Sequence, residues 1–128
     1  MPDKDRSDVE RTKLRPIIWL GDSRKNIQTF PAGARKILGE QLTAIQYGFT
    51  PKDAKPFHGI GPAVVEIAVR HDQNAYRTVA ALSLGKHIYI LHAFHKKAKS
   101  GVSTPKADVD LIKRRYQFAR EVAADEQE

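Results

Sequence analysis

The sequence predicts an α+β domain in which helices pack on a mainly antiparallel sheet. Three strand-like segments follow one another between residues 64 and 95, with links too short for a parallel crossover. Two helical patterns precede these segments and one follows them, so helices and strands do not alternate as they do in parallel α/β folds. With one more strand near the N-terminus, we expect a four-stranded sheet, an N-terminal helical hairpin, a C-terminal helix, and all helices on one face.

The bulk composition fits a single domain of 128 residues. An apolar fraction of 41% argues against wholesale disorder, and the absence of cysteine excludes disulfides, thiolate chemistry and cysteine–zinc sites. No apolar run approaches the roughly 18 residues of a membrane-spanning helix, and the charged N-terminus lacks the apolar region of a signal peptide. We expect a soluble cytoplasmic protein with a flexible arm at 1–14, one domain at 15–124 and a frayed tail at 125–128.

The net charge of +7 is concentrated in one part of the chain. Residues 86–120 contain nine Lys or Arg and two Asp, whereas the other 13 basic and 13 acidic residues cancel. Such a segment is typical of a protein that binds a polyanion, most often nucleic acid. A solvated basic face without a partner is the alternative.

The N-terminal part of the domain predicts one strand and two helices. Pro and Gly bound a short strand at 15–21. A short helix at 24–29 ends before Pro31, because a residue that precedes proline is pushed out of the helical region. Pro31 suits the first turn of a second helix, which Gly48 ends. Apolar residues at helical spacing form one face of this helix: Ala34, Ile37, Leu38, Leu42 and Ile45.

Three strands follow a loop at 50–62 that is rich in Pro and Gly. In the strand at 64–70, apolar residues alternate with Glu66, Ala68 and Arg70. The next strand, at 75–84, is joined to the last by residues 85–86, a link of the kind found in tight hairpins. The last strand starts at His87 and delivers a cationic cluster at 95–97 to its own C-terminal end.

The C-terminal helix has a clear start signal. Thr104 can cap its first turn, and Pro105 follows at the position where helices tolerate proline. Lys106, Lys113 and Arg114 lie away from its apolar stripe.

Four segments together resemble the RelE/HigB superfamily of bacterial toxins, and most closely its phage-derived HigB-like group. The segments are WLGDSRKNI at 19–27, AKPFHGIG at 54–61, VEIAVR with AYR at 65–70 and 75–77, and YILHAFHKKAKSGVSTPKADVDLIKRR at 89–115. The resemblance implies a small α+β fold that cleaves messenger RNA inside a translating ribosome. In this family the RNA 2′-hydroxyl attacks the adjacent phosphate, no metal or organic cofactor takes part, and a cognate antitoxin, often a helix-turn-helix protein, neutralises the toxin.

Carried over by motif, the arginine of the family's Tyr-Arg pair is Arg77, and the basic residue after the last strand is Lys96. The basic position of a Lys-x-x-basic-Gly loop falls on His58, and the arginine that ends the second strand is Arg70. The chain departs from the family in three places. Two positions that are basic in RelE-type nucleases hold Glu66 and Ala68. The catalytic tyrosine near the C-terminus of some members has no obvious counterpart, because Tyr116 lies on the apolar stripe of a helix.

Cleavage through the 2′-hydroxyl needs a base, an acid and cations that stabilise the phosphorane charge. Histidine can fill either proton role near neutral pH, and arginine fits phosphate with two hydrogen bonds. The catalytic candidates are Arg77, Lys96, His95, Arg70 and His58. The candidates for RNA contacts are Lys55, Tyr76, Lys97, Lys99, Lys106, Lys113 and Arg114, with Tyr76 expected to be exposed beside Arg77.

Other interpretations of these residues stay open. Arg77 can instead form a structural ion pair with Glu66 or an aspartate, and His92, inside an apolar strand, is more typical of a satisfied half-buried histidine. His92 and His95 lie three apart on a strand and point to opposite faces, so they predict no metal site. Two rival functions also remain: a ParE-like inhibitor of DNA gyrase, and a basic RNA-binding module without activity.

Overall fold

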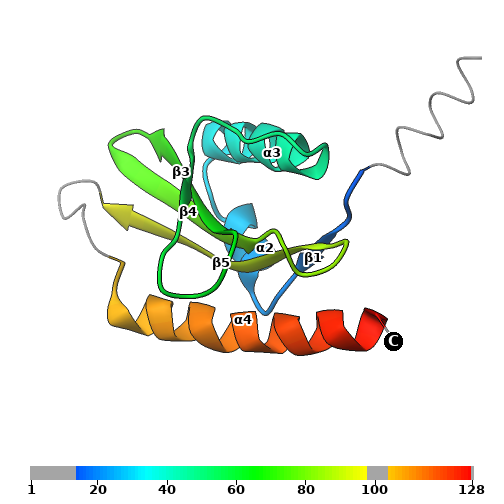
Figure 1. The fold of residues 1–128 in the computed structure, drawn as a ribbon. Coiled ribbons are helices and arrows are strands. Elements are labelled where there is room, and N and C mark those ends of the chain that lie inside the picture. Colours follow the sequence, from blue (N-terminus) through cyan, green and yellow to red (C-terminus); the bar gives the residue numbers. More distant parts are fainter. Residues whose placement is uncertain (1–13, 98–103, 128) are drawn as a thin grey trace, which may run out of the picture.

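The computed structural model describes residues 14–97 and 104–127 (Figure 1). Five strands form one sheet in the order β1-β5-β4-β3-β2. They are β1 (Ile17–Trp19), β2 (Ala54–Pro56), β3 (Val64–His71), β4 (Asn74–Ala81) and β5 (Ile88–Lys97). The helices are α2 (Ser23–Gln28), α3 (Ala32–Gln46) and α4 (Lys106–Gln127). The α+β class is therefore confirmed, with one strand more than the sequence predicted.

The additional strand is β2, which lies in the segment expected to be a loop. It pairs antiparallel with β3 and places Lys55 directly opposite Glu66. Three residues that end in Pro56 carry too little periodicity to signal a strand, and proline is tolerated here because β2 is at the edge of the sheet. All neighbouring strands are antiparallel except β1 and β5, which run parallel.

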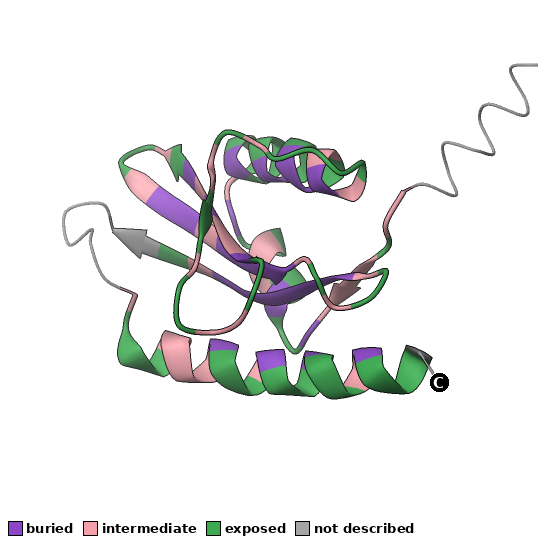
Figure 2. Cartoon of the chain, viewed as in Figure 1, coloured by how far each residue is buried: buried purple, intermediate pink, exposed green. Residues whose placement is uncertain are grey.

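Helices cover both faces of the sheet, so the expectation that they share one face is wrong (Figure 2). One face packs against α3 through residues such as Leu38, Ile67 and Ile90. The opposite face packs against α4 through residues such as Val79, Leu91 and Ile112. The centre of β5 is apolar on both sides, a pattern typical of a strand buried between two layers.

The link between β4 and β5 is longer than predicted. β4 ends at Ala81 and β5 starts at Ile88, so the expected two-residue hairpin at 85–86 is wrong. Arg15 holds this longer link, because its guanidinium donates to the carbonyl oxygens of Leu82 (2.6 Å) and His87 (3.0 Å). Within the pair, the register shifts between Val79 and Ala80, which is a β-bulge in β5.

The helix boundaries follow the sequence signals closely. Pro31 stands at the N-cap of α3, and Gly48, with φ of +91°, follows the C-cap Tyr47. α4 begins at Lys106, directly after the predicted start at 104–105. Among the described residues, no helix is long and apolar enough to cross a membrane.

Candidate functional site

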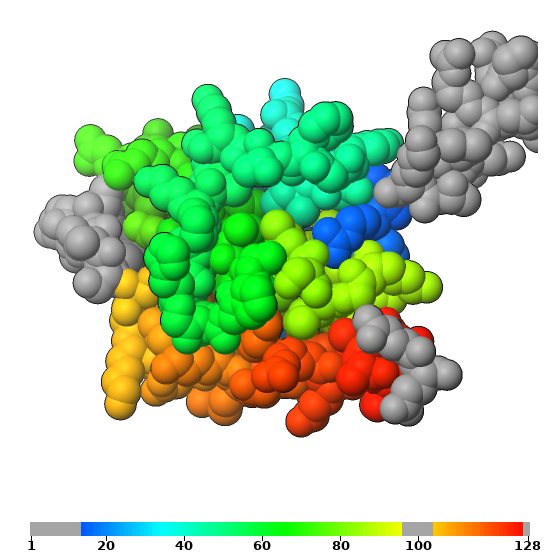
Figure 3. Space-filling model, in the orientation of Figure 1, coloured from blue at the N-terminus to red at the C-terminus, as the bar shows by residue number. Residues whose placement is uncertain are grey.

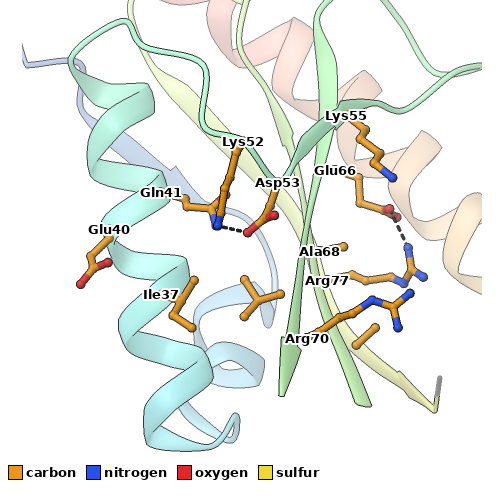
Figure 4. Close-up of a pocket in the computed structure, with 12 residues that line it drawn as sticks. Ile37, Glu40, Gln41, Lys52, Asp53, Lys55, Glu66, Ala68, Arg70 and Arg77 are labelled. Atoms are coloured by element: carbon orange, nitrogen blue, oxygen red, sulfur yellow. Dashed lines mark hydrogen bonds and ion pairs between the residues drawn. The ribbon is translucent and has the colours of Figure 1, made fainter. Parts of the chain in front are cut away.

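A pocket of about 890 Å³ runs along the edge of β3, beyond the point where β2 ends (Figure 4). Val65, Ile67 and Val69 pack toward α3, so the alternating residues of β3 point to the other face of the sheet. The pocket therefore spans the sheet edge, with α3 on one side and charged side chains of the strands on the other. Its lining residues are Ile37, Glu40, Gln41, Lys52, Asp53, Lys55, Glu66, Ala68, Val69, Arg70, Ala75 and Arg77.

Arg77 forms an ion pair with Glu66 at the centre of this strand side. The Arg77 Nη1 donates to Glu66 Oε1 at 2.6 Å, and the two side chains are 17% and 13% exposed. The Nε of Arg77 is buried and has no hydrogen-bond partner among the described residues. The pair that the sequence left open as an alternative is present, and it leaves one edge of the guanidinium without a protein partner.

Two further cations line the same pocket. Lys55 on β2 and Arg70 on β3 are exposed, and the strand register places Lys55 beside the ion pair. Figure 4 shows Lys55, Arg70 and Arg77 along one side of the pocket, whereas Glu40 and Gln41 come from α3. The structure thus brings together Lys55, Arg70 and Arg77, three of the predicted residues, from three adjacent strands.

The lysines that end β5 are placed by backbone register. Lys96 lies opposite Ala75, a pocket residue, and Lys97 lies opposite Asn74. The side chains of Lys96 and Lys97, and all of Lys99, fall outside the described residues.

Tyr76 is buried, so the expectation that it is exposed is wrong. Its side of β4 faces the α3 layer, opposite to Arg77, and only 8% of the residue is exposed. The Tyr76 ring contacts Phe30 at a tilt, with ring centroids 4.9 Å apart, and stacks on His95, with centroids 5.2 Å apart and an interplanar angle of 19°. With 8% of the residue exposed and His95 already stacked on the ring, Tyr76 is not available to stack on a nucleobase in the free protein.

His92 is buried, as the sequence favoured, but only one ring nitrogen is satisfied, because its Nδ1 has no hydrogen-bond partner among the described residues. It is 5% exposed, its Nε2 lies 2.7 Å from Asp108 Oδ1, and its ring stacks on Phe94. His92 contacts α4, whereas His95 stacks on Tyr76 in the α3 layer, so the two imidazoles do lie on opposite faces. No group of three or more potential metal ligands occurs in the part of the chain that the structure describes.

The remaining predicted residues lie away from the pocket at the edge of β3. His58 is exposed on the loop between β2 and β3 and lines a separate shallow pocket made by that loop. The space-filling view shows this loop between α3 and α4 (Figure 3). Lys106, Lys113 and Arg114 are exposed on α4. Tyr116 is buried against the same loop at Gly61, which fits its position on the apolar stripe.

A profile of the phage-derived Gp49-like proteins matches residues 25–117 of the chain. The chain belongs to this family. The match includes α3, the strands β2 to β5, every described residue of the pocket and the first half of α4.

The Gp49-like chain also shares its fold with a solved toxin. A free-state structure of the E. coli toxin RelE, with two arginines replaced by alanine, aligns with a TM-score of 0.56 and 16% sequence identity. The alignment covers 79% of the Gp49-like chain and 97% of the RelE chain. At this identity the likeness shows the fold alone. A search of curated proteins finds no significant match. The Gp49-like match confirms the predicted phage-derived group, and the likeness to RelE confirms the predicted fold.

Sequence reasoning missed one arginine that anchors the Gp49-like fold. Arg115 Nη1 donates to the carbonyl oxygen of Leu91 at 2.9 Å, and its Nη2 donates to Asp22 Oδ1 at 2.8 Å. The hydrogen bond from Arg115 holds the pKa of Asp22 below its usual value, against a smaller opposing effect of burial. The guanidinium lies against Gly21, whose φ is +53° and whose missing Cβ leaves the space. The only signal was the arginine itself, within a run of basic residues.

Proposed function

We propose that this Gp49-like protein is the toxin of a toxin–antitoxin pair and that it cleaves messenger RNA without a metal ion. In this reaction the RNA 2′-hydroxyl attacks the adjacent phosphate. The observation that carries the proposal is the convergence of Lys55, Arg70 and Arg77 from three neighbouring strands on one side of a pocket. Family membership and the fold of a protein described as a toxin support it.

The pocket suits a nucleotide phosphate. Charge develops on the phosphate oxygens as the phosphorane forms, and a positioned guanidinium stabilises that charge before and during the reaction. Arg77 is half-buried, which strengthens its interaction with an anion, and its Nε–H has no protein partner. Arg70 is exposed at the mouth of the pocket, where it can attract the RNA backbone. Lys96, placed by register beside Ala75, would add a further charge.

We assign proton transfer to an exposed imidazole, His95 or His58; neither lines the pocket that holds Arg77, so the RNA would have to extend beyond that pocket to reach either ring. His95 follows the buried core of β5 and precedes Lys96, and His58 lies on the loop that follows Lys55. Both are exposed, and imidazole exchanges protons near neutral pH. His92 does not fit this role, because its ring is buried and Asp108 occupies its Nε2.

The substrate is proposed to be messenger RNA on a translating ribosome, which would supply a defined RNA conformation to a shallow site. We expect the protein to act in the cytoplasm and to be held inactive by a cognate antitoxin. Inhibition of DNA gyrase is the second candidate, because Glu66 neutralises Arg77 in the free protein.

The test replaces both members of the ion pair, because replacing Arg77 alone would leave the half-buried carboxylate of Glu66 without a partner. The protein with Glu66→Gln and Arg77→Gln should lose growth arrest and no longer produce new transcript ends on induction. Loss of one charge-stabilising donor lowers rates roughly 100- to 1,000-fold. Lys96→Ala should have the same effect, and Arg35→Gln, an exposed arginine on α3, is the matched control.

A folded double variant that still arrests growth and cleaves transcripts would place the reaction elsewhere. If DNA replication stops before protein synthesis, and transcripts keep their ends, the gyrase alternative is correct.

A further inference from the structure

Glu66 occupies the position on Arg77 that the proposed function gives to an RNA phosphate. A carboxylate and a phosphate oxygen bind a guanidinium in the same way, through charge-assisted N–H···O bonds. In the 2.6 Å contact between Arg77 Nη1 and Glu66 Oε1, the carboxylate therefore makes the hydrogen bond that we expect a phosphate oxygen to make. Both side chains are largely shielded from water, so a phosphate that reaches Arg77 has to displace this carboxylate or share the guanidinium with it.

The ion pair does not use the whole guanidinium. One nitrogen, Nη1, bonds to one carboxylate oxygen, and the buried Nε has no partner among the described residues. A buried donor without a partner costs roughly 1–3 kcal/mol in desolvation, so a second acceptor at this edge is favoured. Because this Nε is buried in the free protein, an acceptor reaches it only when the Arg77 side chain shifts toward the pocket, which Arg70 and Ala75 also line.

A second cation for Glu66 stands on the neighbouring strand. Lys55 is directly opposite Glu66 in the β2–β3 register, and directly opposite residues have Cβ atoms only about 4.5–5.5 Å apart. Lys55 is exposed and lines the same pocket, as Figure 4 shows. A change of Glu66 rotamer can therefore move its carboxylate from Arg77 to Lys55 while the strands stay in place.

We propose that Glu66 is a positioning residue that competes with phosphate for Arg77 in the free protein and transfers to Lys55 when phosphate binds. This inference rests on the proposed function, because it takes Arg77 as the phosphate-binding group. A purely structural ion pair makes the opposite prediction: removal of Glu66 would loosen Arg77 and weaken anion binding. The sign of the effect separates the two.

The experiment measures binding of inorganic phosphate to the full chain by calorimetry and by NMR of the Arg77 Nε–H signal. Glu66→Gln keeps the size of the side chain and removes its charge. We expect this variant to bind phosphate more tightly by a factor on the order of ten, the scale of one charge-assisted hydrogen bond. The matched control is Glu40→Gln, which removes an exposed carboxylate from the α3 side of the same pocket and should change affinity less than about twofold.

The transfer to Lys55 is tested by a double-mutant cycle. Lys55→Gln should weaken phosphate binding in the wild-type background, because Glu66 then has no second partner. The same change should have little effect in the Glu66→Gln background. An equal loss of affinity in both backgrounds would mean that Lys55 binds phosphate directly. The proposed transfer of Glu66 from Arg77 to Lys55 would then be wrong.

The outcomes for these variants distinguish a failure of this inference from a failure of the proposed function. If Glu66→Gln binds phosphate no better than wild type, while Glu66→Gln with Arg77→Gln loses binding, Glu66 is structural and the inference is wrong although the site stands. If the Glu66→Gln, Arg77→Gln protein binds as wild type does, Arg77 is not the phosphate group and both fail. Circular dichroism checks the fold; if Glu66→Gln does not fold, Glu66→Asp, which withdraws the carboxylate by one methylene, should show a smaller gain in affinity.

Discussion

Arg115 connects three parts of the chain through one guanidinium. It reaches the backbone of β5 at Leu91, the side chain of Asp22 before α2, and the surface of Gly21. Its side chain is 17% exposed, whereas that of Asp22 is 54% exposed. The contact with Leu91 is therefore shielded from water. The contact with Asp22 is open to water, and the Asp22 carboxylate in it can be protonated at low pH.

The pH dependence of stability should reveal the Asp22 contact. Arg115 lowers the pKa of Asp22 in the folded protein, so the carboxylate stabilises the fold above the pKa of the unfolded chain. That contribution is lost as the pH falls from about 4 through the lowered folded-state pKa. Asp22→Asn should be less stable than wild type at pH 7 by less than about 1 kcal/mol, since the group is exposed.

The measurement is urea denaturation at a series of pH values between neutral and strongly acidic. The stability difference between Asp22→Asn and wild type should shrink as the pH falls through this window. A difference that is unchanged at low pH would show that the amide disturbs the turn itself and that charge is not the cause.

At the scale of elements, α4 is fixed to the sheet at its first turn. Asp108 lies in that turn and binds His92 in β5, across the segment 98–103. An acid in the first turn also suits the positive end of the helix dipole. This contact places the start of α4 beside the end of β5, where the predicted cationic cluster lies.

Asp108→Ala should destabilise the protein by about 1–3 kcal/mol, because the buried Nε2 of His92 loses its partner. Thermal denaturation measures the change, and hydrogen exchange should locate the loss of protection in the first turns of α4. Asp110→Ala is the matched control, since this aspartate lies in the same helix without the contact to His92. Equal losses for the two variants would assign the effect to the helix dipole alone.

The outer face of α4 is a second element with a clear expectation. Lys106, Lys113 and Arg114 are exposed on it, and Phe118 is an exposed aromatic. An acidic or amphipathic segment of an antitoxin could bind there through complementary charge and one apolar contact. We therefore expect the antitoxin to contact the region between Lys96 and Arg120.

Charge reversal at Lys113 and Arg114 should weaken the complex with the cognate antitoxin, by roughly 1 kcal/mol or more for each lost pair in a partly shielded interface. Charge reversal at Arg35 and Lys36, an exposed adjacent pair on α3, is the matched control. Hydrogen exchange on the free protein and on the complex checks the location. Protection confined to α2 and α3, with none in α4, would mean that the antitoxin acts by bulk at a distance.

Across the whole molecule, positive charge has two sources. The pocket cations Lys55, Arg70 and Arg77 lie in the part of the chain whose charges cancel, whereas the excess charge lies in residues 86–120. The first group is proposed to act on one phosphate, and the second to hold the RNA backbone. Only the second should dominate the salt dependence.

Affinity for single-stranded RNA should fall with salt at a slope near −0.7 per phosphate contact. Replacing Lys106 or Lys113 with glutamine should make the slope shallower by about 0.7 each, and the same is expected for Lys97 and Lys99. Fluorescence anisotropy across a range of salt concentrations gives the slope. An affinity that does not change with salt would remove the polyanion interpretation.

Much of the fold could be predicted from local pattern, because α3 and β3 each bury a regular set of residues, such as Leu38 and Ile67. The continuous apolar run around Ile90 was a signal that both faces of β5 are covered, but the periodicity of α4 itself does not show which face of the sheet it packs on. β2 is too short to show a period.

For the site, the sequence motifs identified Arg70 and Arg77 as candidates, but the motifs could not predict which side chains surround them. Glu66 could be named only as one possible partner of Arg77. The burial of Tyr76 depends on Phe30, which is distant in sequence, and Arg115 binds Asp22 across 93 residues. Such contacts exist only after the whole chain has folded.

The parallel pairing of β1 with β5 fixes the order in which the chain can assemble during synthesis. Arg15, just before β1, binds the carbonyl oxygen of Lys86, 71 residues further along. At about 5–20 residues per second, the N-terminal strand waits on the order of ten seconds for its partner to be made. Until then β4, which carries Arg77, also lacks its neighbour β5. Under the proposed function, we therefore expect a growing chain that still lacks β5 to be unable to cleave RNA.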